Sequence, residues 1–186
     1  MKPKPEELTE ILRRLSLTPI AQHYEKLGQA AAREGLSHVE YLQRLAQAEA
    51  AVRYERSVQR RTRAARLPVI KTLEQFDWSW PRKINRAQVQ DLFRLRFIEQ
   101  NTNVVFIGGV GLGKTHFALA LAHSACLNNV PTLFATAVEI VNTLSAAQAN
   151  NILPKTLKAY AAPRLLVIDE LGYLPTWGFL CQINQK

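Results

Sequence analysis

The sequence predicts an α/β fold with a parallel sheet, preceded by a small all-helical region. Three observations predict it. A glycine-rich loop lies between a short apolar run and a helical stretch, and a second apolar run ends in two acidic residues. Residues 6–66 carry apolar side chains at helical spacing and no strand pattern. Alternation of buried strands with helices is typical of a doubly wound parallel sheet.

The glycine-rich loop GGVGLGKT, residues 108–115, fits the pattern G-x-x-x-x-G-K-[ST] at every required position. Gly108 and Gly113 allow tight turns that point backbone N–H groups at phosphates, while Lys114 approaches the β- and γ-phosphates and Thr115 binds Mg²⁺. The alternative is a glycine-rich turn that precedes Lys-Thr by chance. We expect a nucleoside triphosphate to be bound by the following residues: Gly108, Gly109, Val110, Gly111, Leu112, Gly113, Lys114, Thr115 and His116.

The surrounding elements are predicted from patterning and capping signals. A helix that begins at the loop would direct its N-terminal dipole at the phosphates. Thr136 and Glu139 form a capping box, which places a helix start between them. The expected elements are a buried strand at 103–107, a helix at 115–127, a strand at 131–135, a helix at 137–149, a helix at 154–161 and a strand that begins at 165 and ends in two acidic residues.

Two carboxylates follow the last of these strands. Asp169 is expected to hold Mg²⁺, directly or through water, and Glu170 to orient or deprotonate an attacking water. Lys114 and Glu170 are therefore the candidate catalytic residues. The alternative is an ordinary strand that ends in a surface Asp-Glu pair.

Composition excludes several classes of protein. The chain has 186 residues, enough for one domain with an appendage, and no apolar run approaches 18 residues. The N-terminus lacks the apolar segment of a signal peptide, and Cys126 and Cys181 show no metal-binding spacing. We therefore expect a cytoplasmic protein with reduced thiols and no membrane partner.

The formal net charge of +9 is concentrated in one segment. From Arg53 to Arg86 there are ten Lys or Arg residues against three acidic residues. Six arginines lie at the end of a long helix that opens with a Ser37–Glu40 capping box. The inner face of this helix is expected to begin with Leu42, Leu45, Ala46 and Val52, and several of the arginines continue the line of Leu42 and Leu45. Contact with nucleic-acid phosphates is the favoured interpretation, and a solvated helix face is the alternative. The arginines are Arg53, Arg56, Arg60, Arg61, Arg63 and Arg66.

Asn85 and Gln88 predict the start of a further helix, with Val89, Leu92, Phe93 and Phe97 as its buried face. Aromatic residues precede it, and they could form an adenine pocket or pack the linker onto the core. Packing is slightly favoured. The residues concerned are Leu73, Phe76, Trp78 and Trp80.

Taken together, these motifs resemble the IstB family of ATP-binding transposition helpers, which are AAA+ P-loop ATPases related to DnaC-type helicase loaders. The resemblance rests on GLSHVEYLQRL, RYERSVQRRTRAARLP, KTLEQFDWSW, GGVGLGKTHFALALA and LLVIDELGYLP, and it covers about residues 8–175. It implies ATP and Mg²⁺ as cofactors. It also implies double-stranded DNA, a cognate transposase and an ATP-dependent homo-oligomer as partners, and it places Leu73 and Phe76 where related ATPases contact adenine.

The resemblance ends after Pro175, where residues 176–186 do not match the family's continuation. We therefore expect an incomplete core without the C-terminal strands and lid, and impaired hydrolysis. The expected domains are a helical DNA- or partner-binding region (1–67), a linker and leading helix (68–100), the ATPase core (101–175) and an atypical tail (176–186). A helicase loader and a non-hydrolysing DNA-binding remnant are the alternative functions.

Overall fold

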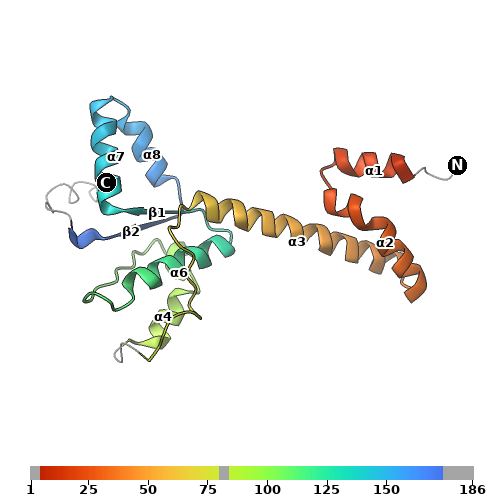
Figure 1. The fold of residues 1–186 in the computed structure, drawn as a ribbon, viewed down its shortest axis with the longest axis horizontal. Coiled ribbons are helices and arrows are strands. Elements are labelled where there is room, and N and C mark those ends of the chain that lie inside the picture. The colour runs from red at the N-terminus through yellow and green to blue at the C-terminus, as the bar shows by residue number, and fades with distance from the viewer. Residues whose placement is uncertain (1–4, 80–83, 174–186) are drawn as a thin grey trace. The chain divides into compact units, whose positions relative to one another are not determined.

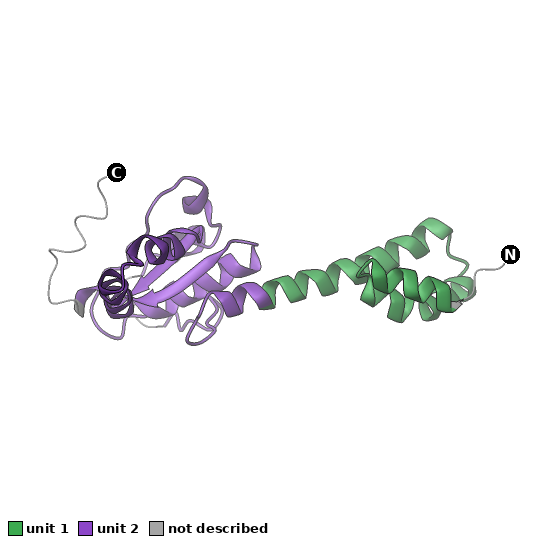
Figure 2. Cartoon of the chain, turned by 90° about the horizontal axis from the view of Figure 1, so that it is seen from above, with its two compact units in different colours: residues 1–59 green, residues 60–186 purple. Residues whose placement is uncertain are grey.

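The computed structural model describes residues 5–79 and 84–173 of the chain, and Figure 1 draws the order of its elements. The chain separates into two compact units, residues 1–59 and 60–186 (Figure 2). This separation falls inside the helix His38–Ala64, whereas the first predicted domain boundary follows residue 67. The expected tail 176–186, Trp80 and Cys181 lie outside the described residues.

The elements are α1 (Pro5–Arg14), α2 (Thr18–Glu34), α3 (His38–Ala64), α4 (Arg86–Leu92), α5 (Arg96–Glu99), α6 (Lys114–Leu127), β1 (Thr132–Thr136), α7 (Ala137–Ala149), α8 (Leu153–Ala161), β2 (Leu165–Asp169) and the 3-10 turn η1 (Leu171–Tyr173).

The helices of the first unit begin and end where local signals place them. Gly35 ends α2 in the left-handed conformation (φ 65°), which costs glycine little because it lacks a Cβ. The predicted capping box then opens α3: the Glu40 N–H donates to Ser37 Oγ over 3.2 Å, and the Ser37 N–H donates to Glu40 Oε2 over 2.8 Å. This capping prediction is confirmed.

The buried face of α3 differs from the predicted one. Leu45 is buried, but Leu42 is 64% exposed and Ala46 is also exposed. The helix is oriented by polar contacts with α2, because the Tyr41 hydroxyl donates to the Tyr24 carbonyl over 2.8 Å and Glu49 Oε2 accepts from the Ile20 N–H over 3.4 Å. Apolar spacing alone could not reveal that a carboxylate occupies the inner face.

The second unit contains a two-stranded parallel sheet. β1 and β2 pair in register from Thr132 opposite Leu165 to Thr136 opposite Asp169. Both strands and the connecting α7 and α8 lie where the sequence predicted them, to within a residue. The α7 capping box is also present, with the Glu139 N–H donating to Thr136 Oγ1 over 3.2 Å and the Thr136 N–H donating to Glu139 Oε2 over 2.8 Å.

Helix α6 forms the centre of this unit. It contributes one or two buried residues to each of the three apolar clusters. They are Phe117 in one cluster, Leu119 and Ala122 in another, and Leu121 and Ala125 in the third. A helix that is apolar on all sides is expected to be buried, and its residues 119–122 are all less than 5% exposed. The residues at its N-terminus are therefore carried by the best-packed element of the unit.

The prediction of a buried strand at 103–107 is wrong. The segment has no regular secondary structure, and Val105 and Ile107 are 70% and 92% exposed. Phe106 packs against the clusters of Leu121 and Phe117, so only one side of the segment is covered. A strand requires a hydrogen-bonded neighbour, and among the described residues β2 pairs only with β1 and no strand lies beside 103–107.

The single helix expected after Asn85 is interrupted. Asn85 Oδ1 accepts from the Gln88 N–H over 3.1 Å, as its capping role predicted, but α4 ends at Leu92. Leu95 adopts the left-handed conformation (φ 59°) and begins the short α5. Because of this break, Leu95 and Ile98 reach the α6 core, whereas Phe93 and Phe97 are only partly buried.

No helix in the described part of the chain has the length and apolar character needed to span a bilayer.

Candidate nucleotide site

The loop between residues 108 and 113 is shaped by two glycines with left-handed backbone. Gly111 has φ 79° and Gly113 has φ 82°, a region that other residues occupy only with strain. At Gly113 there is a second constraint, because an added Cβ would lie 2.5 Å from Phe76 Cε2. The end of the loop is therefore fixed both by its own conformation and by the aromatic side chain behind it.

The backbone of this loop offers unpaired hydrogen-bond donors. Among the described residues, the backbone N–H groups from Gly108 to Gly113 donate to no acceptor, and those of Lys114, Thr115 and His116 begin α6 without an intrahelical partner. The Lys114 ammonium donates to the Gly109 carbonyl over 2.7 Å, which holds the positive charge across the loop. Unpaired N–H groups, a helix N-terminus and an ammonium group are the donors that phosphates require.

Thr115 and Asp169 meet at the edge of the loop. The Thr115 hydroxyl donates to Asp169 Oδ1 over 3.2 Å, which joins the first turn of α6 to the carboxyl end of β2. Adjacent ligands of an octahedral Mg²⁺ lie about 2.9 Å apart, since Mg–O distances are about 2.0–2.1 Å. A hydroxyl and a carboxylate oxygen at this separation fit Mg²⁺ in both chemistry and spacing.

Glu170 is positioned by its backbone rather than by its side chain. Its N–H donates to Asp169 Oδ1 over 3.0 Å, and its φ of 60° is unusual for a residue other than glycine. The residue is exposed at the end of β2, beside the Asp169 carboxylate. The two carboxylates are therefore held in different environments, one bound to Thr115 and one directed into solvent.

His116 and Phe76 attach the linker to α6. His116 Nε2 lies 2.9 Å from the Thr72 carbonyl oxygen, and the ring centroid of Phe76 lies 4.2 Å from that of Phe117 and 5.0 Å from that of Trp78. Phe76 is only 9% exposed. These contacts favour packing over an adenine contact for Phe76, and they direct the His116 side chain toward the linker.

Comparison with known proteins identifies the family. The family model of the IstB-like ATP binding protein matches residues 10–177, almost the whole chain. The chain belongs to the IstB-like ATP-binding family of insertion sequences.

Named relatives of the IstB-like chain come from several bacteria. It is 38% identical over 169 residues to a protein of insertion sequence IS21 from Pseudomonas aeruginosa that is described as ATP-binding, covering 91% of this chain and 64% of that protein. Identity is 33% to the corresponding protein of IS5376 from Geobacillus stearothermophilus, with 91% and 67% covered. For IS232 from Bacillus thuringiensis subsp. berliner it is 35%, with 94% and 70% covered. The chain thus spans about two thirds of the length of these relatives.

The six arginines of this IstB-like chain fall into two groups. Arg53 pairs with the buried Glu49 over 2.7 Å and donates to the Ser16 carbonyl over 3.1 Å, while Arg61 donates to the Cys126 carbonyl over 2.8 Å. These two side chains bond to groups within their own units, although the Arg53 side chain is itself 56% exposed. The other four are exposed, and three of them follow one face of α3 at spacings of four and three residues: Arg56, Arg60 and Arg63, with Arg66 beyond the helix end.

Proposed function

We propose that this chain binds ATP with Mg²⁺ in the loop of residues 108–115, within an AAA+ type core. The contact that carries the proposal is the one between Thr115 and Asp169, because it brings the two expected metal ligands together from elements far apart in the sequence. Lys114 and the loop N–H groups would bind the β- and γ-phosphates. Glu170 would stand beside the metal as the group that orients a water molecule.

The chain is further proposed to bind duplex DNA through the exposed arginines of α3. Arg56, Arg60 and Arg63 recur on one helix face, and Glu55 is the nearest acidic residue in the sequence. Arginine forms two parallel hydrogen bonds with a phosphate and keeps its charge at all physiological pH values. Contacts of this kind bind the backbone and carry little sequence information, which suits a protein that accepts many target sites.

Within its insertion sequence, the chain is proposed to act as an ATP-dependent helper that assembles on DNA with further copies and engages the transposase. Three relatives whose names place them in insertion sequences support the context. The likeness to helicase loaders concerns the same nucleotide loop and does not distinguish the partners. The partner therefore has to be tested directly.

The test combines duplex binding with partner capture. The full chain and its Lys114→Ala variant are titrated into a labelled 40-base-pair duplex with and without ATP and Mg²⁺. Capture of a cognate transposase and capture of a replicative helicase are measured separately for each protein. We expect DNA binding that ATP strengthens in the unmodified chain alone, and capture of the transposase. Capture of the helicase alone would reassign the chain to helicase loading.

A further inference from the structure

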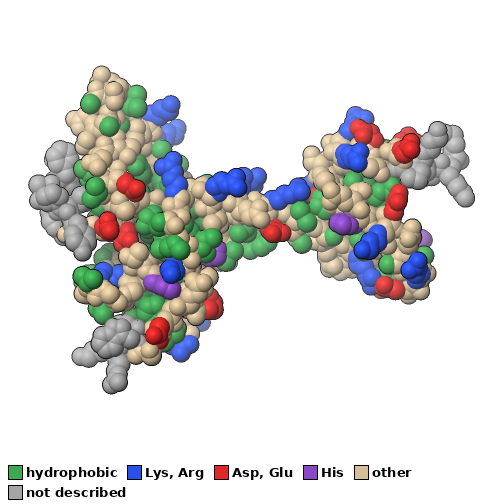
Figure 3. Space-filling view, in the orientation of Figure 1, with side chains coloured by type: hydrophobic (Ala, Val, Ile, Leu, Met, Phe, Trp, Pro, Cys, Tyr) green, Lys and Arg blue, Asp and Glu red, His purple; other side chains and the backbone are tan. Residues whose placement is uncertain are grey.

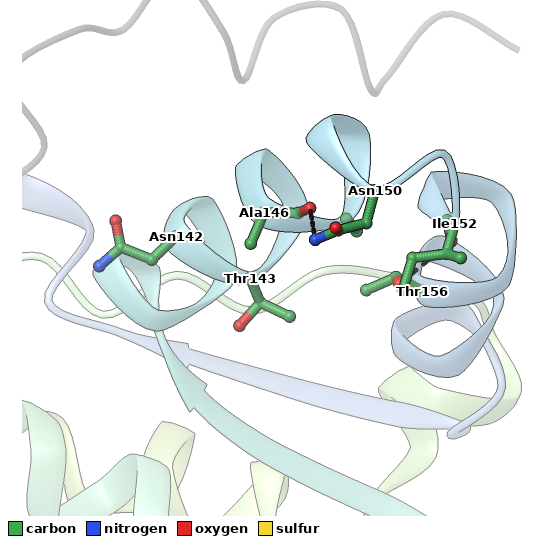
Figure 4. Close-up of a pocket in the computed structure, with 7 residues that line it drawn as sticks. Asn142, Thr143, Ala146, Asn150, Ile152 and Thr156 are labelled. Atoms are coloured by element: carbon green, nitrogen blue, oxygen red, sulfur yellow. Dashed lines mark hydrogen bonds between the residues drawn. The ribbon is translucent and has the colours of Figure 1, made fainter.

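Two hollows lie side by side on the second unit, away from the nucleotide loop. One lies between the end of α3, β1 and α8 and has a volume of about 380 Å³; among its lining residues are Arg66, Thr143, Thr156 and Tyr160. The other, of about 480 Å³, lies between α7 and α8, where Figure 4 shows Asn142, Thr143, Asn150 and Thr156 around it. Because Thr143 and Thr156 line both hollows, the two form one continuous surface, which we call the basic groove.

Arg66 is the charged residue among those that line the groove, and further cationic residues lie beside the lining residues in two segments of the chain. Residues 60–73 and 140–168 contain no Asp or Glu, and they carry eight cationic residues: Arg60, Arg61, Arg63, Arg66, Lys71, Lys155, Lys158 and Arg164. In Figure 3, Lys and Arg side chains line both α8 and the C-terminal end of α3 on the face in view. Among the described residues, Arg63, Arg66, Lys155 and Lys158 take part in no ion pair. Their charge is therefore available to an external anion.

Apart from Arg66, the groove is lined by uncharged side chains, in which hydroxyl and amide groups stand among small apolar residues. Within the described part of the chain, the hydroxyls of Thr143 and Tyr160 make no hydrogen bond, and Tyr160 is half-buried beside Thr156. Hydroxyl and amide donors of this kind commonly bind phosphate and sugar oxygens.

We infer that the basic groove binds the sugar–phosphate backbone of duplex DNA, with Lys155 and Lys158 of α8 contacting phosphates next to those bound by Arg63 and Arg66. This inference rests on the DNA binding proposed above and extends it to α8, a helix without a ligand-binding sequence motif. Thr143 and Tyr160 would donate to phosphate oxygens between the two rows of cations. The interaction would be independent of the nucleotide loop.

The test measures duplex affinity as a function of salt concentration. The full chain, the double variant Lys155→Ala/Lys158→Ala and the charge-matched control Lys26→Ala/Arg33→Ala on α2 are titrated into a labelled 40-base-pair duplex between 50 and 300 mM salt. Each phosphate contact contributes about 0.9 to the slope of log affinity against log salt concentration. The α8 variant should lose about 1.8 from that slope and bind about tenfold more weakly at 100 mM salt, while the control keeps the slope of the unmodified chain.

The outcomes separate this inference from the function on which it rests. If the unmodified chain binds duplex, loses affinity with Arg56→Ala/Arg60→Ala/Arg63→Ala, and keeps its slope with the α8 variant, the basic groove is overturned and the α3 contact survives. If the unmodified chain binds no duplex, both fail together. If the α8 variant and its control lose duplex affinity equally, the effect comes from net charge and the inference is overturned. Competition by polyglutamate but not by unlabelled duplex would assign the groove to an acidic peptide.

Labelled ATP should bind the α8 variant as it binds the unmodified chain, which shows that the variant is folded.

Discussion

The Thr115 hydroxyl donates a hydrogen bond of 3.2 Å to Asp169 Oδ1, across 54 residues of sequence. This contact joins the N-terminus of the most buried helix to the end of β2. Both side chains are oxygen donors of the type that Mg²⁺ prefers, and neither is bound to a cationic side chain among the described residues. The nucleotide site proposed here depends on this junction.

Replacing one carboxylate oxygen of Asp169 should weaken the Mg²⁺-dependent binding of ATP. In Asp169→Asn the carboxylate charge is lost but the size is kept, so ATP affinity should fall by about 10–100-fold in Mg²⁺ and little in EDTA. Titration of labelled ATP in the two buffers measures the difference. Glu170→Gln serves as the matched control, because it removes the neighbouring charge without touching Thr115. A uniform loss in both buffers for Asp169→Asn would argue against a metal role.

Gly113→Ala should destabilise the second unit more than Gly111→Ala. Both glycines have left-handed backbone, with φ of 82° and 79°, but only a Cβ at position 113 would lie 2.5 Å from Phe76. Left-handed strain costs about 1–2 kcal/mol in either variant, and the overlap adds about 1–3 kcal/mol at position 113. Urea unfolding of the two variants gives the difference. Equal midpoints would show that Phe76 does not restrict the loop.

Arg56, Arg60 and Arg63 should respond to substitution differently from Arg53, which is paired with the buried Glu49. Arg56→Ala/Arg60→Ala/Arg63→Ala should reduce duplex affinity and its salt dependence, with little change in the free energy of unfolding. Arg53→Ala should instead destabilise the fold, because it leaves the buried Glu49 carboxylate without its cation. Anisotropy of a labelled duplex and thermal unfolding measure the two effects. If Arg53→Ala leaves the unfolding temperature unchanged, the division into two groups is wrong.

The Cys126 thiol should be protected in the folded chain. Burial raises the pKa of this thiol above its ordinary value of 9.0, and the residue is 0% exposed on α6. As the pH rises, the Cys126 thiol ionises in the unfolded chain before it ionises in the folded chain. Its contribution to the free energy of unfolding is therefore present below pH 9.0 and is lost as the pH rises toward the folded-state pKa. In a Cys181→Ser background, iodoacetamide at pH 8 should modify Cys126 slowly without urea and rapidly with it. Equal rates in the two conditions would show that α6 is not buried.

Local sequence signals predicted most elements of the second unit, since they act over a few residues. The Thr136–Glu139 capping box and the Asn85 cap depend on side chains three residues apart, and both are present. Most apolar residues of α6 are buried, from Phe117 to Cys126, as its composition indicates. The prediction of tight turns at Gly108 and Gly113 is confirmed at Gly113, but the other glycine of the loop with left-handed backbone is Gly111 and not Gly108.

Features that depend on distant partners could not be predicted in this way. The segment 103–107 has the composition of a strand, but composition does not reveal whether a neighbour pairs with it. The buried Glu49 on the inner face of α3 reflects contacts with Arg53 and α2 that spacing does not show. The overlap of Phe76 with position 113 was also missed, and the only signal for it was the aromatic density of KTLEQFDWSW.

Binding of labelled ATP to the purified full chain, with and without Mg²⁺, tests the nucleotide site most directly when it is compared with Lys114→Ala. Removing the ammonium should weaken binding by about tenfold or more, because a hydrogen bond to a charged group contributes about 1.5–3 kcal/mol. The account predicts saturable binding that requires both Lys114 and Mg²⁺. A folded chain that fails to bind ATP, or binds it equally well after Lys114→Ala, would contradict it.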